Sequence, residues 1–112
     1  MRRSADFTET VRAGRRAGRR TLVVHLRTRS TDVAGSGHTA PIVGLVVGRS
    51  VGGSVVRHQV SRRLRAQLAP RLHRLPVGSA TVVRALPPAA TATSAQFGAD
   101  LDAALDRLTG RR

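Results

Sequence analysis

The hydrophobic pattern changes its period in the middle of the chain, between residues 42 and 68. From Ile42 to Val47 the residues are almost all apolar and several are β-branched, which is typical of a buried strand. After a pair of glycines, apolar residues recur at every fourth position, which is a helical spacing. The sequence therefore predicts a buried strand, a glycine turn and an amphipathic helix that ends before Pro70, because proline lacks a backbone donor. The helical apolar positions are Val56, Val60, Leu64 and Leu68.

The polar positions of this predicted helix are rich in arginine. Arg57, Arg62, Arg63 and Arg65 lie between its apolar residues, and residues 33–99 contain no aspartate or glutamate. A solvated helix face usually mixes charges of both signs, whereas a row of guanidinium groups suits a row of phosphates. Twenty basic residues against six acidic ones give the chain a formal net charge of +14. We favour nucleic-acid binding, although a plain solvated face or a codon bias toward arginine would leave the same trace.

Length and composition bound the class of protein. A chain of 112 residues is enough for one modest core, so we expect a single domain over residues 1–112. There is no cysteine, and the four histidines are too far apart for a local zinc motif. No apolar run approaches the roughly 20 residues that cross a bilayer, and no hydrophobic segment follows the basic N-terminus. We expect a cytoplasmic protein that binds no membrane.

Further elements are predicted on both sides of the central segment. Phe7 and Val11 lie one helical turn apart on a short N-terminal helix, where Phe7 would serve as a core anchor. Strands are predicted over residues 21–26 and 79–86, which are rich in β-branched residues. Residues 93–96 have the pattern of a capping box, and a C-terminal helix follows. Its apolar stripe consists of Phe97, Leu101, Ala104, Leu105 and Leu108.

The sequence shows no catalytic site. Asp100, Asp102 and Asp106 are the only carboxylates after residue 32. We expect Asp102 and Asp106 on the outer side of the last helix, away from the arginine-rich segment, where acids usually serve solubility. The serines and histidines form no recognisable pair of nucleophile and base. The protein is therefore predicted to have no active site of its own.

The arginine-rich segment resembles the signature of the protein subunit of bacterial ribonuclease P. In that family a strand ends in a basic pair, a Gly-x-Ala-Val-like turn follows, and a basic, leucine-containing helix opens with Arg-Asn-Arg. The order of the other predicted elements is similar too, so the resemblance covers nearly the whole chain. The sequence departs from the family pattern at Ser50, His58, Gln59 and Ser61. The matching residues are Arg49, Gly52, Val55, Arg57, Val60, Arg62, Arg63, Leu64 and Arg65.

The resemblance implies an α+β fold, a two-layer sandwich of a mixed four-stranded sheet and three helices in the order αβββαβα. From the residues alone only three strands can be read. The resemblance also implies a left-handed crossover from the second strand that we read, through the arginine-rich helix, to the last strand. Strand twist favours the right-handed form in about 98% of such connections, so the family and the general rule disagree here.

The resemblance further implies a protein that assists an RNA enzyme. Its arginine-rich helix would bind the catalytic RNA, one protein for each RNA, and the protein would also bind the 5′ leader of precursor tRNA. The RNA would remove that leader with Mg²⁺ ions held mainly by the RNA subunit and the substrate. The residues implied for the leader cleft are Phe7, Val11 and His25. Those implied for the catalytic RNA are Arg49, Arg57, His58, Arg62, Arg63 and Arg65.

Two less specific interpretations stay open at this point. A ribosomal or other nucleic-acid-binding module, without a part in any reaction, would have the same charge and size. A histidine on a strand, such as His25, is more often an ordinary surface residue than a ligand contact. A nuclease that works without RNA is disfavoured, because the sequence has no carboxylate cluster for two metal ions.

Overall fold

The structure is a computed structural model that describes residues 14–28, 42–76 and 78–110. Its sheet has four strands in the spatial order β1-β2-β4-β3. The pairs β1–β2 and β2–β4 are antiparallel, and β3–β4 is parallel. The mixed four-stranded sheet of the expected α+β fold is therefore confirmed. The strands are β1 (Arg15–Gly18), β2 (Leu22–Thr28), β3 (Ile42–Val46) and β4 (Ser79–Ala85).

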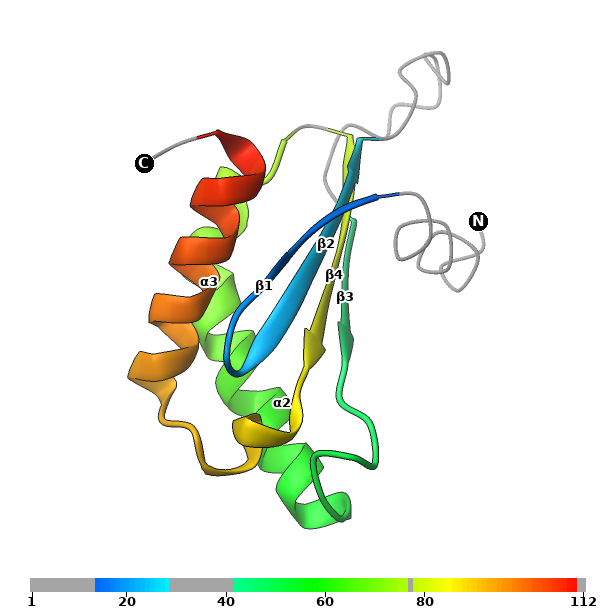
Figure 1. The fold of residues 1–112 in the computed structure, drawn as a ribbon, viewed down its shortest axis with the longest axis vertical. Helices are drawn as coiled ribbons and strands as arrows, with labels where there is room; N and C mark the ends of the chain where they lie inside the picture. Colours follow the sequence, from blue (N-terminus) through cyan, green and yellow to red (C-terminus); the bar gives the residue numbers. More distant parts are fainter. Residues whose placement is uncertain (1–13, 29–41, 77, 111–112) are drawn as a thin grey trace.

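Two α-helices, α2 (Ser54–Leu68) and α3 (Ser94–Thr109), cover one face of the sheet (Figure 1). Two 3₁₀-helices, η2 (Ala69–Arg74) and η3 (Pro87–Thr91), follow α2 and β4. The expected order has three helices, but the part of the chain that the structure describes contains only these two α-helices. The predicted N-terminal helix lies outside the described residues.

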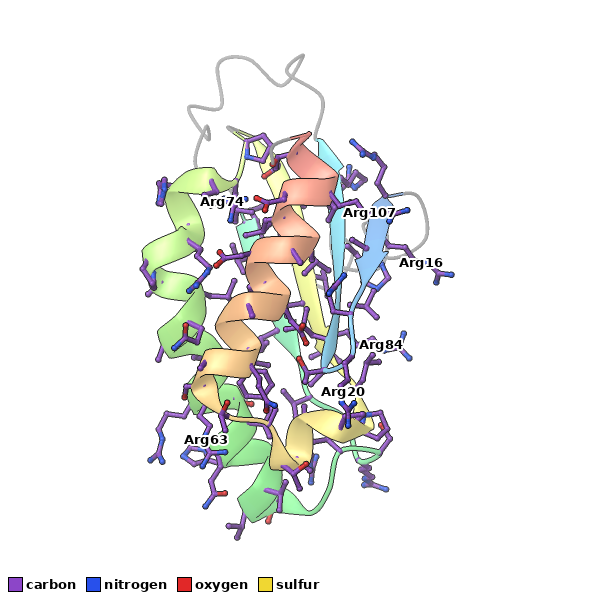
Figure 2. All side chains as sticks on the ribbon, turned by 60° about the vertical axis from the view of Figure 1, so that its left-hand side comes forward. Arg16, Arg20, Arg63, Arg74, Arg84 and Arg107 are labelled. Atoms are coloured by element: carbon purple, nitrogen blue, oxygen red, sulfur yellow. The ribbon has the colours of Figure 1, made fainter. Side chains whose placement is uncertain are left out.

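The connection from β3 to β4 runs through α2. Seen from the helix side, with β3 and β4 both running downward, β4 lies to the right of β3 (Figure 2). This is a left-handed crossover, the sense that strand twist disfavours. The hand decides which face of the sheet carries α2. A right-handed connection between the same two strands would place the helix on the opposite face.

Strand β1 escapes sequence analysis because nothing in its local sequence favours a strand. It contains two arginines, one alanine and one glycine, and of these only Ala17 is buried. It forms because it pairs with β2, with Ala17 opposite Val24. The turn that follows is held by Asp100 of α3, whose Oδ2 accepts hydrogen bonds from Thr21 N at 3.1 Å and Thr21 Oγ1 at 2.5 Å. Tertiary contacts therefore define this strand.

The main core lies between the sheet and the two helices. Alternate residues of β2 point into it, and they meet the apolar stripes of both helices as their spacing predicts. The capping box at the start of α3 is present, with Gln96 N donating to Thr93 Oγ1 and Thr93 N donating to Gln96 Oε1. Phe97 follows directly and is the largest fully buried side chain of the described residues.

Truncation of Phe97 tests this account of the core. We expect Phe97→Ala to lower the free energy of unfolding by about 3–5 kcal/mol, because the lost ring leaves a cavity. Val55→Ala is the control, since Val55 is 70% exposed and its truncation should change stability by less than about 0.5 kcal/mol. Urea denaturation measures both. Equal effects of the two substitutions would contradict the placement of Phe97 at the centre of the core.

Candidate nucleic-acid interface

Helix α2 has one buried stripe and one exposed stripe. Val60, Leu64 and Leu68 are buried, and the outward positions of the same helix carry His58, Arg62 and Arg65, which are exposed. We call these three residues the α2 stripe. They fall on one side because positions three and four apart share a helix face. The first turn of α2 carries no acidic residue, so the stripe is purely basic and suits a polyanion.

The other two arginines predicted for RNA binding in α2 lie at the margins of the stripe. Arg63 is half-buried, and its Nη1 donates a hydrogen bond of 3.4 Å to the Ala92 carbonyl oxygen. Arg57 is also half-buried, and its Nε is buried without a hydrogen-bond partner. The predicted set is therefore divided: Arg62 and Arg65 are exposed and can meet a large ligand, whereas Arg57 and Arg63 are half-buried.

The turn before α2 brings Arg49 to the surface. Val51 N donates to Gly48 O at 3.1 Å and Gly52 N donates to Arg49 O at 3.2 Å, which closes the turn. A Cβ at Gly52 would lie 3.0 Å from Val56 Cβ and Cγ1, so this position requires glycine. The close approach sets how the chain enters α2, and Arg49 is exposed at that entry.

The carboxylates of α3 do not have the solubilising role expected for them. Asp102 accepts hydrogen bonds from Arg71 Nε at 2.7 Å and Arg74 Nη1 at 3.1 Å, and Asp106 pairs with Arg74. They pair instead with Arg71 and Arg74 of η2, which follow the arginine-rich segment in the chain and turn toward α3. The hydrogen bond from Arg71 lowers the pKa of Asp102 and raises the pKa of Arg71. The positive charges of Arg71 and Arg74 are therefore neutralised by the carboxylates of α3, whereas those of the α2 stripe have no carboxylate partner among the described residues.

A second basic group lies on the sheet face that the two helices leave uncovered. Arg16 of β1 lies opposite His25 of β2. Arg84 of β4 lies opposite Val23, which precedes His25 by two residues in β2. Both arginines are exposed and project from the sheet (Figure 2). Sequence analysis missed them, although Arg84 is the only charged residue of strand β4. Together with the α2 stripe, they give the protein exposed cations on two faces.

His25 lies between these two arginines and is almost completely buried. Only 2% of it is exposed, and neither ring nitrogen has a hydrogen-bond partner. Burial lowers the pKa of His25, and the neighbouring charges of Arg84 and Arg16 lower it further. The imidazole is therefore neutral at pH 7. Of the residues implied for the leader cleft, His25 alone is described, since Phe7 and Val11 lie outside the described residues.

The described residues contain no group of three histidine, cysteine or carboxylate side chains that could hold a metal ion. Among the helices of that same part of the chain, none is long and apolar enough to cross a membrane.

Comparison with known proteins gives one consistent result. The family model "Ribonuclease P" matches residues 1–109. The chain is 56% identical over 112 residues to the "Ribonuclease P protein component" of Streptomyces bikiniensis, covering 98% of this chain and 91% of the relative. The protein of that name in Corynebacterium diphtheriae is 49% identical over 111 residues, with 97% and 92% covered.

Solved structures agree on the fold. The RNase P protein of Staphylococcus aureus has a TM-score of 0.77 at 20% identity, with 96% of this chain and 92% of that chain covered. The RNase P protein of Thermotoga maritima has a TM-score of 0.74, also at 20% identity, with 100% and 96% covered.

The lowered pKa of His25 predicts a pH dependence of stability. In the unfolded chain the histidine has its ordinary pKa of 6.5, so below that pH the unfolded state binds the proton more readily than the folded state. Stability should be complete above about pH 6.5 and should decrease as the pH falls toward the lower folded pKa. The lowered pKa of Asp102 changes stability only in more acidic solution, because the ordinary pKa of an aspartate is 3.8.

His25→Leu should remove this decrease. The measurement is urea unfolding at about pH 7.5 and about pH 5.5. His58→Leu, on the exposed stripe, is the matched control and should keep the decrease. A decrease of unchanged size in His25→Leu would assign the pH dependence to another group.

Proposed function

The chain belongs to the bacterial ribonuclease P protein family, and from this membership we propose that it holds the catalytic RNA on one face and precursor tRNA on another. It is the protein component of the ribonucleoprotein that matures the 5′ end of tRNA, and the catalysis of that enzyme is performed by its RNA. The alternative of an unrelated ribosomal or nucleic-acid-binding module is not favoured. The two RNAs would meet different residues of the chain.

In this proposal the α2 stripe, with Arg49 at the entry to the helix, binds the catalytic RNA. The observation that carries the assignment is an exposed row of basic side chains that has no carboxylate in its own helix, beside a helix whose carboxylates are already paired. A folded RNA is gripped mainly through its phosphates, and fixed guanidinium groups are suited to them. Arg57 and Arg63 support the edges of this surface. One protein would bind each RNA.

Precursor tRNA is assigned to the opposite face of the sheet. Phe7, Val11 and His25 would line the cleft for the single-stranded 5′ leader. Support comes from Arg16 and Arg84, which flank His25 and are exposed there. His25 is buried and neutral, so it adds no charge between the two cations, and phosphates of the leader would meet Arg16 and Arg84.

Mg²⁺ enters the proposal as an ion held by the RNA subunit and the substrate. The described residues offer no set of three ligands for it, so no step of the reaction is assigned to the protein side chains. The protein contributes by neutralising phosphates where two RNAs approach each other, a task that Mg²⁺ would otherwise perform alone. A cytoplasmic location belongs to the same proposal.

Reconstitution tests the proposed function. Precursor tRNA is incubated with the protein alone, with a bacterial ribonuclease P RNA alone, and with both, at low and high Mg²⁺. We expect no cleavage by the protein alone and a gain from the protein that is largest at low Mg²⁺, because its cations replace part of the metal screening. Cleavage by rigorously RNA-free protein would overturn the assignment of catalysis to the RNA.

The salt dependence of RNA binding tests the α2 stripe. Each neutralised phosphate contributes about −0.9 to the slope of log affinity against log salt for duplex, and about −0.7 for single strands. Arg62→Ala should therefore flatten the slope by about one unit. Arg63→Ala is a matched control in the same helix and should flatten it less, because Arg63 is half-buried and bonded to Ala92. Equal slopes for Arg62→Ala and wild type would show that Arg62 belongs to an ordinary solvated face.

A further inference from the structure

A groove runs between the edge strand β3 and the C-terminal end of α2. It has a volume of about 440 Å³, which lies within the range of sites for small organic molecules. One wall comes from β3 and the other from α2 and η2. The residues that matter here are Val43, Leu45, Arg65, Leu68, Ala69 and Leu72.

The walls of this groove combine apolar side chains with one cation. Val43 and Leu45 are half-buried, and Leu72 is 41% exposed, one of the few large apolar side chains among the described residues that solvent reaches. The guanidinium-bearing Arg65 is the single charged residue of the lining. β3 also ends the described sheet, so its outer backbone groups pair with no strand of that sheet. The groove thus offers apolar contact, a positive charge and backbone hydrogen-bonding groups.

The groove continues the surface already assigned to the catalytic RNA. Arg65 belongs both to the α2 stripe and to the groove lining. A phosphate held by Arg65 at this end of the stripe therefore lies beside the opening. Folded RNAs present unstacked bases in loops and bulges, and proteins bind such bases between flat or apolar side chains while reading their edges by hydrogen bonds.

The composition of the chain strengthens this assignment. Proteins usually stack bases on aromatic rings, but this sequence has two phenylalanines and no tyrosine or tryptophan. Phe97 is fully buried in the core, so on the helix side no phenylalanine of the described residues can receive a base, and the exposed rings there are the imidazoles of His58 and His73. The groove adds an aliphatic surface against which a base can leave water.

We propose that this groove receives one unstacked nucleotide of the catalytic RNA, with its base between β3 and η2 and its phosphate at Arg65. The inference rests on the proposed function, since it names a contact within the RNA surface of α2. A second copy of the chain is a poorer occupant, because two chains of +14 repel each other.

Filling the groove provides the test. Ala69 is exposed and lines the groove, so Ala69→Phe should occupy it and weaken binding of ribonuclease P RNA by about tenfold, the loss expected for one base contact. The slope of affinity against salt should stay at the wild-type value, because no phosphate contact is removed. Ala99→Phe is the matched control, since Ala99 is exposed on α3, away from the groove, and it should bind as wild type does.

Two further measurements keep the test decisive. Leu72→Ser removes an apolar wall of the groove at an exposed position without filling the space. It should also weaken binding of the RNA, so it tests the groove even if Ala69→Phe does not fold. Chemical probing of the RNA bases at saturating protein should find a nucleotide that is protected by wild type and by Ala99→Phe but reactive with Ala69→Phe.

The outcomes are distinguishable. Wild-type affinity in both groove variants, or no change in base reactivity, would overturn the groove site and leave the proposed function intact. Failure of wild-type protein to bind the RNA would overturn the proposed function itself. A dimer of RNA-free protein that Ala69→Phe abolishes in sedimentation would assign the groove to a second copy and likewise reject the proposal.

Discussion

The antiparallel pairing of β2 with β4 is the constraint on which the rest of the structure depends. Its register runs from Leu22 opposite Ala85 to Thr28 opposite Ser79. Because successive side chains of a strand point to opposite faces, this single register sends one set of residues into the core under the helices. The alternate set, which includes His25 and Arg84, goes to the other face. A slip of one residue would exchange the two sets.

The left-handed crossover from β3 to β4 then decides how the two faces are used. It places α2 on the same face of the sheet as α3 (Figure 1), and the α2 stripe lies on the exposed side of that helix. The face with Arg16, His25 and Arg84 is left free of these helices. A right-handed connection would have covered that face with α2. The uncommon hand therefore keeps both basic groups exposed, one on α2 and one on the uncovered face of the sheet.

The carboxylates of α3 act within the fold, where they join elements. Asp100 holds the turn between β1 and β2, while Asp102 and Asp106 bind η2 to α3. These pairs are partly exposed, so each contributes modestly to stability. Their larger effect is on the distribution of charge. Arg71 and Arg74 are compensated by these carboxylates and the arginines of the α2 stripe are not, so the uncompensated charge lies on the outer side of α2, where RNA phosphates can neutralise it.

The sequence by itself determined the elements whose signals are local. The spacing of Val60, Leu64 and Leu68 predicted α2, the capping box predicted the start of α3, and β-branched runs predicted β3 and β4, since each signal depends on neighbouring residues only. The acid-free arginine pattern predicted a basic helix, and its resemblance to a family supplied the fourth strand and the crossover hand.

Only the tertiary structure decided what depends on how distant elements pack. It made a strand of β1, whose residues favour none, and it paired Asp102 with Arg71, which are 31 residues apart. It separated exposed Arg62 from half-buried Arg63, and it brought Arg16 and Arg84 to the two sides of His25. The physical reason is the same in each case: exposure and charge pairing are set by side chains from other segments, and a local pattern carries no record of which segments those will be.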